Sequence, residues 1–581
     1  MHELRIGNIC NNNCAICGHI GNKSGCNMGT IDIRRNLRAL AAQSSEIVIS
    51  GGEPAIREDY REIMDYASSL FDKVTVRTNG RIFSYREYCD TAENAIITFF
   101  THKPELHNKI TGTDSFDQTI AGIRNLVAGK KQVKINHVIC SANYDHLPQT
   151  FDFLGDLGVK SVIYSFADIG LDKAMPAILE IVKKGTGINV EFSEYRQYIS
   201  ILANRMFCGP ALAQFEITNN CNHNCIFCYH HSPLLKREDD PYWKTHKFNR
   251  EYVKRTQEWR NKRIDPQLVK SYIDEMAGAG TTYVQFAGGG EPMTHPEIMD
   301  MIRYVKKKGL TLQIFSNSAL ITPQRMKLMH KWGVDVIETN ISAVTKETYA
   351  KVHPGREDDF ALVKNNLKAL MSMKQNATDK PEIRIMNTIT NLNAHEIDIM
   401  PQFAHEHGAS SVYLGLLQTT EITEHLLPQD IPMVSSKIGS ALSYLKKHPL
   451  TNNFRQYLEL IKNEKTRDGS HSMDIYDRTG CFIGYLEIQV HVDNKVAPCC
   501  LHPTILDIKG RSFAEVWNSD EYQRFRDRLQ ETFISKANKE LLCRGCRMCV
   551  YLPEHLKWHK KLQDKKLIKH LYKNETNPQT A

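Results

Sequence analysis

The feature that most constrains this chain is a cysteine pattern that occurs twice. The first copy reads LRIGNICNNNCAICGH, and the second reads FEITNNCNHNCIFCYH, 211 residues further on. Each copy is a short strand-like run followed by an asparagine-rich loop with the spacing Cys-x-x-x-Cys-x-x-Cys. The six cysteines are Cys10, Cys14 and Cys17 in the first copy and Cys221, Cys225 and Cys228 in the second.

Three cysteines this close together can approach one iron–sulfur cluster from three corners, because thiolates are the usual protein ligands of such clusters. The missing fourth ligand leaves one iron open for a small molecule. The spacing does not favour a zinc knuckle, which normally pairs two short Cys-x-x-Cys units.

A glycine turn follows each cysteine loop, after a helix candidate and a strand. The first turn, in EIVISGGEP, contains Gly51, Gly52, Glu53 and Pro54, and the second, in YVQFAGGGEP, contains Gly289, Gly290, Glu291 and Pro292. Glycine lets the backbone come close to a ligand, and proline stiffens the turn. The pairing of the same turn with both cysteine loops argues against a chance match.

After both turns, apolar and β-branched runs alternate with helical patterns. The spacing predicts strands at 73–77, 95–100, 133–139, 310–315, 334–338 and 383–388, and helices at 116–128, 358–373 and 394–407. This alternation predicts parallel sheets with crossover helices. If the sheets close like barrels, the cysteine loops and glycine turns fall at the carboxyl ends of the strands, where such folds place their sites.

The size and composition predict a multidomain protein of the cytoplasm. The 581 residues are enough for three or four domains. No run approaches the roughly eighteen apolar residues of a membrane span, and the N-terminus has no secretory pattern. In a long chain without that pattern, sixteen cysteines indicate metal ligands or redox groups rather than disulfides.

Two basic segments stand outside the repeat pattern. The second copy is 27 residues longer than the first between the third cysteine and the glycine turn, mostly through a basic, aromatic segment at 236–263. This segment is either a surface insertion or a lid that contacts substrate. The lysine-rich residues 555–574 are either a solvated terminal helix or tail, or a segment that binds a polyanion. The net charge of +8 mildly favours a polyanionic partner.

The two repeats closely resemble the radical S-adenosylmethionine (radical SAM) superfamily. The resemblance extends to VTVRTNG and VKINHVICSANYDHL in the first copy and to IFSNSALI and NISAVTKETYAKVHPG in the second. It implies that each cysteine triplet holds a 4Fe–4S cluster whose open iron chelates S-adenosylmethionine, and that each glycine turn meets the amino group of that ligand. It also implies an aromatic residue over the adenine; Phe227 fills this place in the second copy, whereas the first has Ile16.

Residues 481–549 carry a third group of cysteines: Cys481, Cys499, Cys500, Cys543, Cys546 and Cys549. This region resembles the SPASM and twitch modules of radical SAM enzymes. The shared features are a strand pair at 487–490 and 495–497, a Phe-Ala-Glu-Val-Trp helix and a closing Cys-x-x-Cys. The resemblance implies one auxiliary 4Fe–4S cluster on Cys481, Cys499, Cys543 and Cys546, with Cys500 and Cys549 as spare or alternative ligands. Taken alone, the cysteines are also compatible with zinc.

The resemblance implies an α/β chain with two partial (β/α) TIM-barrel-like domains in tandem and a small SPASM/twitch-like domain. The expected boundaries are 1–205 for the first radical SAM domain, 206–465 for the second with its basic insertion, 475–552 for the cluster domain and 553–581 for a lysine-rich tail.

The implied reaction is reductive cleavage of S-adenosylmethionine to a 5′-deoxyadenosyl radical, which takes a hydrogen atom from a C–H bond. The expected partners are S-adenosylmethionine, an electron donor such as flavodoxin or ferredoxin, and a peptide or nucleic-acid substrate. The leading prediction is modification of a peptide or protein. The alternatives are a nucleic-acid base or nucleotide-linked group, as in DNA hypermodification, a small carbohydrate, and a non-enzymatic, metal-bearing scaffold that binds nucleic acid. No catalytic side chain is identified.

The cysteine groups predict about three 4Fe–4S clusters per chain after anaerobic reconstitution, because thiolates ligate such clusters. Iron and acid-labile sulfide analysis checks this number. An iron content equivalent to a single cluster would contradict two of the three assignments, and zinc without sulfide would favour the scaffold.

Overall fold

The computed structural model describes residues 2–17, 26–184, 187–228, 230–234, 257–373, 379–417, 426–463, 479–499, 505–534, 549 and 552–571. The chain divides into two compact units. The first contains Met1–Phe207 and Leu562–Ala581, and the second contains Cys208–Lys561.

The first unit is built on a seven-stranded parallel sheet whose strands follow one another in chain order. The strands are β1 (His2–Arg5), β2 (Glu46–Ser50), β3 (Lys73–Thr78), β4 (Asn94–Phe99), β5 (Gln132–Ile139), β6 (Ser161–Phe166) and β7 (Asn189–Phe192). The helices are α1 (Thr30–Ala41), α2 (Tyr60–Ser68), α3 (Pro104–Thr111), α4 (Phe116–Ala128), α5 (Leu147–Asp156), α6 (Leu171–Lys183) and α7 (Arg196–Ala203). This is the strand order of the expected partial (β/α) barrel.

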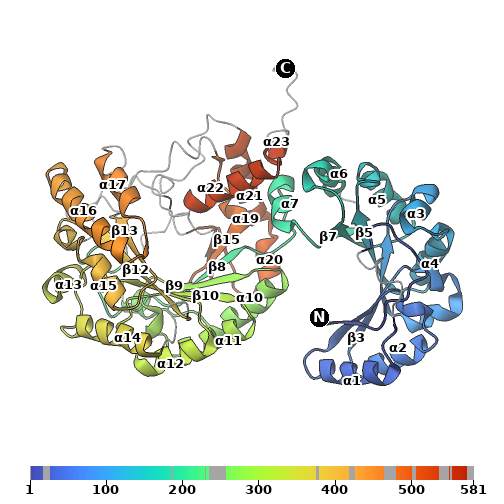
Figure 1. Ribbon diagram of the computed structural model, residues 1–581, viewed down its shortest axis with the longest axis horizontal. Helices are drawn as coiled ribbons and strands as arrows, with labels where there is room; N and C mark the ends of the chain where they lie inside the picture. The colour runs from blue at the N-terminus through green and yellow to red at the C-terminus, as the bar shows by residue number, and fades with distance from the viewer. Residues whose placement is uncertain are drawn as a thin grey trace, which may run out of the picture. The chain divides into compact units, whose positions relative to one another are not determined.

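One face of this sheet is covered by helices, and Figure 1 shows α2, α4 and α5 along that side. Alternate residues of β5 are buried, namely Ile135, His137 and Ile139, while the residues between them are partly exposed. Successive strand residues point to opposite faces, so the buried set packs under the helices and the other set forms the open face.

The second unit repeats this plan in a ten-stranded sheet of the order β14-β13-β12-β11-β10-β9-β8-β15-β16-β17. The strands are β8 (Leu212–Glu216), β9 (Tyr283–Ala287), β10 (Thr311–Ser316), β11 (Val336–Asn340), β12 (Glu382–Ile389), β13 (Ser411–Leu416), β14 (Thr451–Asn452), β15 (Glu487–Val490), β16 (Lys495–Ala497) and β17 (Leu506–Asp507). The longer helices are α10 (Pro266–Gly278), α11 (Ile298–Lys307), α12 (Pro323–Trp332), α13 (Lys346–Val352), α14 (Asp359–Met373), α15 (Met400–Glu406), α16 (Ile431–Lys447), α17 (Phe454–Lys462) and α21 (Asp520–Ile534). A further helix, α22 (Leu552–Asp564), begins in the second unit and ends in the first.

The C-terminal strand pair continues the sheet of the second unit. β15 pairs in parallel with β8, the strand that leads into the second cysteine loop, and pairs antiparallel with β16. Asn494, at φ 60°, makes the turn between β15 and β16, as expected for an Asp-Asn turn. The Phe-Ala-Glu-Val-Trp helix is α20 (Phe513–Trp517), capped by Ser512. The predicted hairpin and helix are therefore present.

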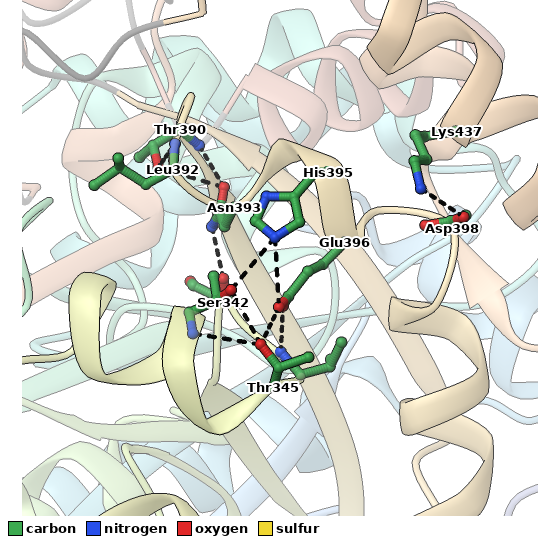
Figure 2. A network of polar contacts seen from close by, with 11 residues as sticks. Ser342, Thr345, Thr390, Leu392, Asn393, His395, Glu396, Asp398 and Lys437 are labelled. Atoms are coloured by element: carbon green, nitrogen blue, oxygen red, sulfur yellow. Dashed lines mark hydrogen bonds and ion pairs between the residues drawn. The ribbon is translucent and has the colours of Figure 1, made fainter. Parts of the chain in front are cut away.

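A buried asparagine ties together the loops after neighbouring strands in both units. In the first, Asn143 donates to the carbonyls of Phe100 (2.7 Å) and Val138 (2.9 Å). In the second, Asn393 donates to the carbonyls of Ser342 (2.6 Å) and Thr388 (2.8 Å). Figure 2 shows the contact with Ser342. The two units thus share a side-chain anchor as well as a strand order.

Glu396 extends this network in the second unit (Figure 2). Its carboxylate is buried and accepts hydrogen bonds from the backbone N–H of Val344 (2.7 Å) and from the Thr345 hydroxyl. The loop after β11 is therefore held to the segment after β12 by side chains from both.

The predicted helix at 394–407 is two pieces, the 3₁₀ turn η6 (Ala394–Glu396) and α15. Pro401 has no N–H to donate to the carbonyl four residues earlier, so it begins a helix instead of continuing one. The basic C-terminal segment is helical in its described part, α22 and α23 (Ile568–Leu571), and it buries Trp558, Leu562 and Leu571. One face of this segment is therefore packed, whereas full solvation was expected.

Among the helices of the described ranges, none has both the length and the apolar composition needed to cross a membrane.

Two buried histidines should make the first unit sensitive to acid. Burial lowers the pKa of His107 to about 4 and that of His137 to about 3. The unfolded chain takes up protons near the ordinary pKa of about 6.5, so stability is full above that pH and falls as the pH drops toward 4. At pH 5 the loss is about 2 kcal/mol for each histidine.

We expect His137→Leu to reduce the loss of unfolding free energy between pH 7.5 and pH 5 by roughly 2 kcal/mol, as measured by urea unfolding of the cluster-free protein. His146→Gln is the matched control, because His146 lies on the same unit and is partly exposed. An equal loss of unfolding free energy between pH 7.5 and pH 5 in both variants would contradict the assignment of the acid sensitivity to His137.

Candidate functional site

The glycine turn of the second unit is bonded directly to the start of its cysteine loop. The N–H of Gly290 donates to the carbonyl of Thr218 (2.9 Å), and the N–H of Glu291 donates to the carbonyl of Asn220 (2.7 Å). A Cβ atom on Gly290 would lie 2.1 Å from that Asn220 oxygen. Glycine is therefore required here for the two backbones to approach.

The first unit has the same contacts. The N–H of Gly52 donates to the carbonyl of Gly7 (2.9 Å), and the N–H of Glu53 donates to that of Ile9 (2.8 Å). A Cβ atom on Gly52 would lie 2.2 Å from the Ile9 oxygen. The structure thus brings each predicted glycine turn against its predicted cysteine loop.

The glutamate of each turn points into the protein. The Glu291 carboxylate accepts from the N–H of Met293 (3.0 Å), the Ser316 hydroxyl (2.8 Å) and the N–H of Asn317 (2.7 Å). Burial raises its pKa, although these hydrogen bonds oppose the rise. A carboxylate with these three partners fixes the turn to the end of β10.

Glu53 has the equivalent partners. Its carboxylate accepts from the N–H of Ala55 (3.1 Å), the Thr78 hydroxyl (2.8 Å) and the N–H of Asn79 (2.6 Å). Burial likewise raises its pKa against the effect of these bonds. An asparagine at the end of each next strand then reaches the cysteine loop, with Asn79 donating to Asn11 (2.6 Å). In the second unit, Asn317 donates to Asn222 (2.8 Å).

The three cysteines of the second loop are partly buried, and their thiols lie close enough to affect one another's pKa. Burial raises the pKa of Cys221 to about 12, with contributions from Glu291 and Cys228. Burial, Cys228 and Cys221 hold the pKa of Cys225 well above its ordinary value. Each thiol is close enough to another to disfavour its ionisation, as required of ligands that converge on one cluster, and cluster uptake must displace their protons.

The first loop is more open. Cys10 and Cys17 are exposed, and burial, followed by the repulsion of Cys10 and Cys17, raises the pKa of Cys14 to about 11. Ile16 packs against a small apolar cluster of Phe100, Ile110 and Cys140. These three thiols can also converge on one cluster, but the residue before the third cysteine contributes to the core.

Three side chains that the motifs did not identify surround the second loop. His353 Nδ1 lies 3.0 Å from Cys225 Sγ, and the Phe227 ring meets the His353 ring edge-on at 5.3 Å. His231 Nε2 contacts the carbonyl of Gly289 (2.7 Å), and the Trp259 ring lies 5.7 Å from the His231 ring.

Trp259 belongs to the described end of the basic insertion, in α9 (Gln257–Asn261). The following backbone is fixed to the cysteine loop, with the N–H of Asn219 donating to the carbonyl of Lys262 (3.0 Å). The insertion therefore contacts the glycine turn at its described end; residues 235–256 lie outside the described ranges. The aromatic content of the insertion was the only sequence signal for this contact, and it did not indicate which ring would reach the glycine turn.

The C-terminal cysteines are described only in part. Cys481 and Cys549 are buried, and Cys499 is partly exposed. His555 Nε2 lies 3.9 Å from Cys481 Sγ. Cys500, Cys543 and Cys546 lie outside the described residues, so the predicted four-cysteine ligand set stays a prediction.

Comparison with protein families identifies the chain. The model of the radical SAM superfamily matches residues 4–191 and again 215–397. These segments cover well over half of the 581 residues, so the chain belongs to the radical SAM superfamily. The SPASM model, an iron–sulfur cluster-binding domain, matches residues 481–549. The expected tandem architecture with a C-terminal SPASM module is confirmed.

Several known proteins are similar to the chain. The AdoMet-dependent heme synthase of Methanosarcina barkeri is 23% identical over 357 residues, which covers 59% of this chain and 93% of that protein. A GTP 3′,8-cyclase of Vibrio parahaemolyticus is 29% identical over 169 residues, 26% of this chain and 50% of the cyclase. The crystal structure of Streptococcus suis SuiB bound to precursor peptide SuiA matches with 15% identity, 66% and 79% coverage and a TM-score of 0.41.

Membership of the superfamily identifies the chain as an enzyme whose cofactors are 4Fe–4S clusters and S-adenosylmethionine. These cofactors fit the site, because each unit combines three thiols close enough to raise one another's pKa with a glycine turn whose backbone approaches the thiol-bearing loop.

We expect Gly290→Ala to lower iron retention and S-adenosylmethionine binding, because its Cβ atom would collide with the Asn220 carbonyl. Iron analysis and equilibrium binding measure both. Gly278→Ala, at the end of α10 with no atom within 4 Å of its Cβ position, is the matched control. It should be neutral or stabilise the protein by up to about 1 kcal/mol. Equal iron and ligand binding in both variants would contradict a role for the close approach at Gly290.

Proposed function

We propose that the second radical SAM domain is the catalytic one and that the chain modifies a large or tethered substrate, a peptide or protein. In this proposal Cys221, Cys225 and Cys228 hold the catalytic cluster, and an external flavodoxin or ferredoxin reduces it. Cys10, Cys14 and Cys17 hold a second radical SAM-type cluster. The domain boundaries are those expected from the sequence, with residues 475–552 as the auxiliary module.

The observation that carries this proposal is the pairing of β15 with β8. β8 leads into the second cysteine loop, and β15 lies between Cys481 and Cys499 of the SPASM module. A side-chain contact joins the ends of the two strands, with His491 Nδ1 2.7 Å from the Glu216 carboxylate. The segment between Cys481 and Cys499 therefore joins the sheet that leads into the second cysteine loop.

The surroundings of the thiols support the same choice. Cys225 is covered by His353, and Trp259 and His231 lie over Gly289, whereas Cys10 and Cys17 of the first loop are exposed. Radical chemistry needs a site that excludes solvent and side reactions. The second site has more of the required enclosure.

When bound and reduced, a 4Fe–4S cluster on these thiols would supply the electron for reductive cleavage of S-adenosylmethionine. The chain's own part is positioning. The three thiols hold the cluster, and Gly289 and Gly290 let the backbone reach the ligand's amino group. Glu291 fixes their turn to β10, while Pro292 stiffens it. Phe227 and Trp259 supply apolar surface that excludes water. The equivalent turn of the first domain is Gly51, Gly52, Glu53 and Pro54.

The peptide or protein class is supported by the SPASM module, which resembles the modules of peptide- and protein-modifying members. The second candidate is a nucleic-acid base or nucleotide-linked group. It is favoured by the similarity to a protein named GTP 3′,8-cyclase and by the exposed Lys262 and Arg263 beside Trp259. Basic side chains contact phosphates, and aromatic rings stack on bases.

We expect Cys225→Ala to abolish formation of 5′-deoxyadenosine from S-adenosylmethionine under reducing conditions, because one ligand of the catalytic cluster is lost. Cys14→Ala, the equivalent change in the first loop, should retain turnover; chromatography of the product measures both. The reverse pattern would assign catalysis to the first domain.

The nucleic-acid alternative has its own test. If a nucleic acid binds beside Trp259, retention of DNA should weaken steeply with salt, and Lys262→Gln with Arg263→Gln should reduce the logarithmic salt slope by up to about two. Lys446→Gln with Lys447→Gln, an exposed pair on α16, is the matched control. Absence of retention at low ionic strength would remove the polymer alternative and leave the peptide proposal in place.

A further inference from the structure

We infer that His353 is a hydrogen-bond donor to the cluster ligand Cys225 and that this bond sets the second cluster at a higher reduction potential than it would otherwise have. The inference rests on the proposed function, because it takes Cys225 as a ligand. The contact that carries it is the 3.0 Å approach of His353 Nδ1 to Cys225 Sγ.

The His353 ring is held in place by its neighbours. It stacks on the Tyr349 ring with a centroid distance of 4.6 Å and an interplanar angle of 26°. Phe227 meets it edge-on at 5.3 Å, and His223 lies 6.1 Å away. The side chain is 2% exposed. A ring fixed on these sides cannot swing away from the thiol.

The direction of the hydrogen bond follows from the chemistry of the ligand. A cluster-bound thiolate carries no proton, so Nδ1 must be the donor. The nitrogen that faces sulfur is Nδ1, so a neutral His353 makes this bond in the tautomer that carries its proton on Nδ1. Hydrogen bonds to the sulfurs are among the factors that set the potential of an iron–sulfur cluster. They favour the reduced form, whose sulfur ligands carry more negative charge.

The first unit provides an internal comparison. Ala15 donates to the carbonyl of Ile110, and Ile226 donates in the same way to the carbonyl of Val352, so the two loops are fixed alike. In the second unit, His353 directly follows Val352 in the chain. In the first unit, Cys14 packs against the apolar residues Phe100 and Ile110. In place of a histidine, Cys14 has a side-chain hydrogen bond from Asn12, which lowers the pKa of this thiol. The second cysteines of the two loops therefore have different donors: an amide in the first unit and a buried imidazole in the second.

The test is a potentiometric titration followed by electron paramagnetic resonance, in the full chain with Cys10, Cys14 and Cys17 replaced by Ala. The signal that changes when S-adenosylmethionine is added identifies the cluster with an open iron. His353→Phe keeps an aromatic ring without a donor, and His353→Asn keeps a donor at the position of Nδ1. Tyr349→Phe is the matched control, because it keeps the stacked ring and leaves the His353–Cys225 contact intact.

We expect the Phe variant to show about a tenfold lower ratio of reduced to oxidised cluster at a fixed potential, equivalent to about 59 mV for a one-electron couple. The Asn variant and the control should stay close to the parent. An unchanged potential in the Phe variant would overturn the inference. If the Phe variant takes up no cluster while the Asn variant does, a donor at this position is needed to retain the cluster, and the inference is supported. If neither variant takes up a cluster, His353 has a packing role and the inference is overturned. Absence of any signal sensitive to S-adenosylmethionine in the parent would instead contradict the proposed function.

Discussion

The arrangement of both sites depends on one buried carboxylate in each unit. Glu53 and Glu291 each accept hydrogen bonds from the backbone two residues later, from a hydroxyl at the end of the next strand and from the N–H that follows it. Leaving those backbone donors unpaired in the interior would cost about 1–3 kcal/mol each. The carboxylate thus fixes the glycine turn to the next strand. The N–H groups of the glycine turn then hold the cysteine loop.

The two repeats share this frame and differ in what surrounds the thiols. The asparagine anchors Asn143 and Asn393 and the glycines that meet the cysteine loops are present in both. In the second unit His353 and Trp259 approach the site, and Trp259 comes from the basic insertion that lengthens this copy. The asparagine anchors and the glycine contacts serve the fold of both units, whereas His353 and Trp259 act on the surroundings of the second cluster site.

The sequence was sufficient for the features that are local. Strands and helices followed from periodicity, and the cysteine loops and glycine turns followed from their spacing; both turns lie where predicted. The environment of the thiols could not be predicted, because it depends on contacts between residues far apart in the chain. His353 is 128 residues from Cys225 and is one histidine among twenty-four. The pairing of β15 with β8 likewise has no local pattern, since a strand's sequence does not specify which edge it joins.

The open setting of the first cysteine loop bears on why that loop has cysteines at all. Cysteine is among the residues most often buried, and its side chain adds to stability mainly through packing. Cys10 and Cys17 are exposed, so the core of the first unit gains little from them. Their thiols share one short loop with Cys14, and the Gly52 and Glu53 amides hold that loop against the turn. A frame that holds exposed thiols in a fixed arrangement is explained by ligand binding and not by folding, which argues that the first unit also holds a cluster although the enclosed site is in the second.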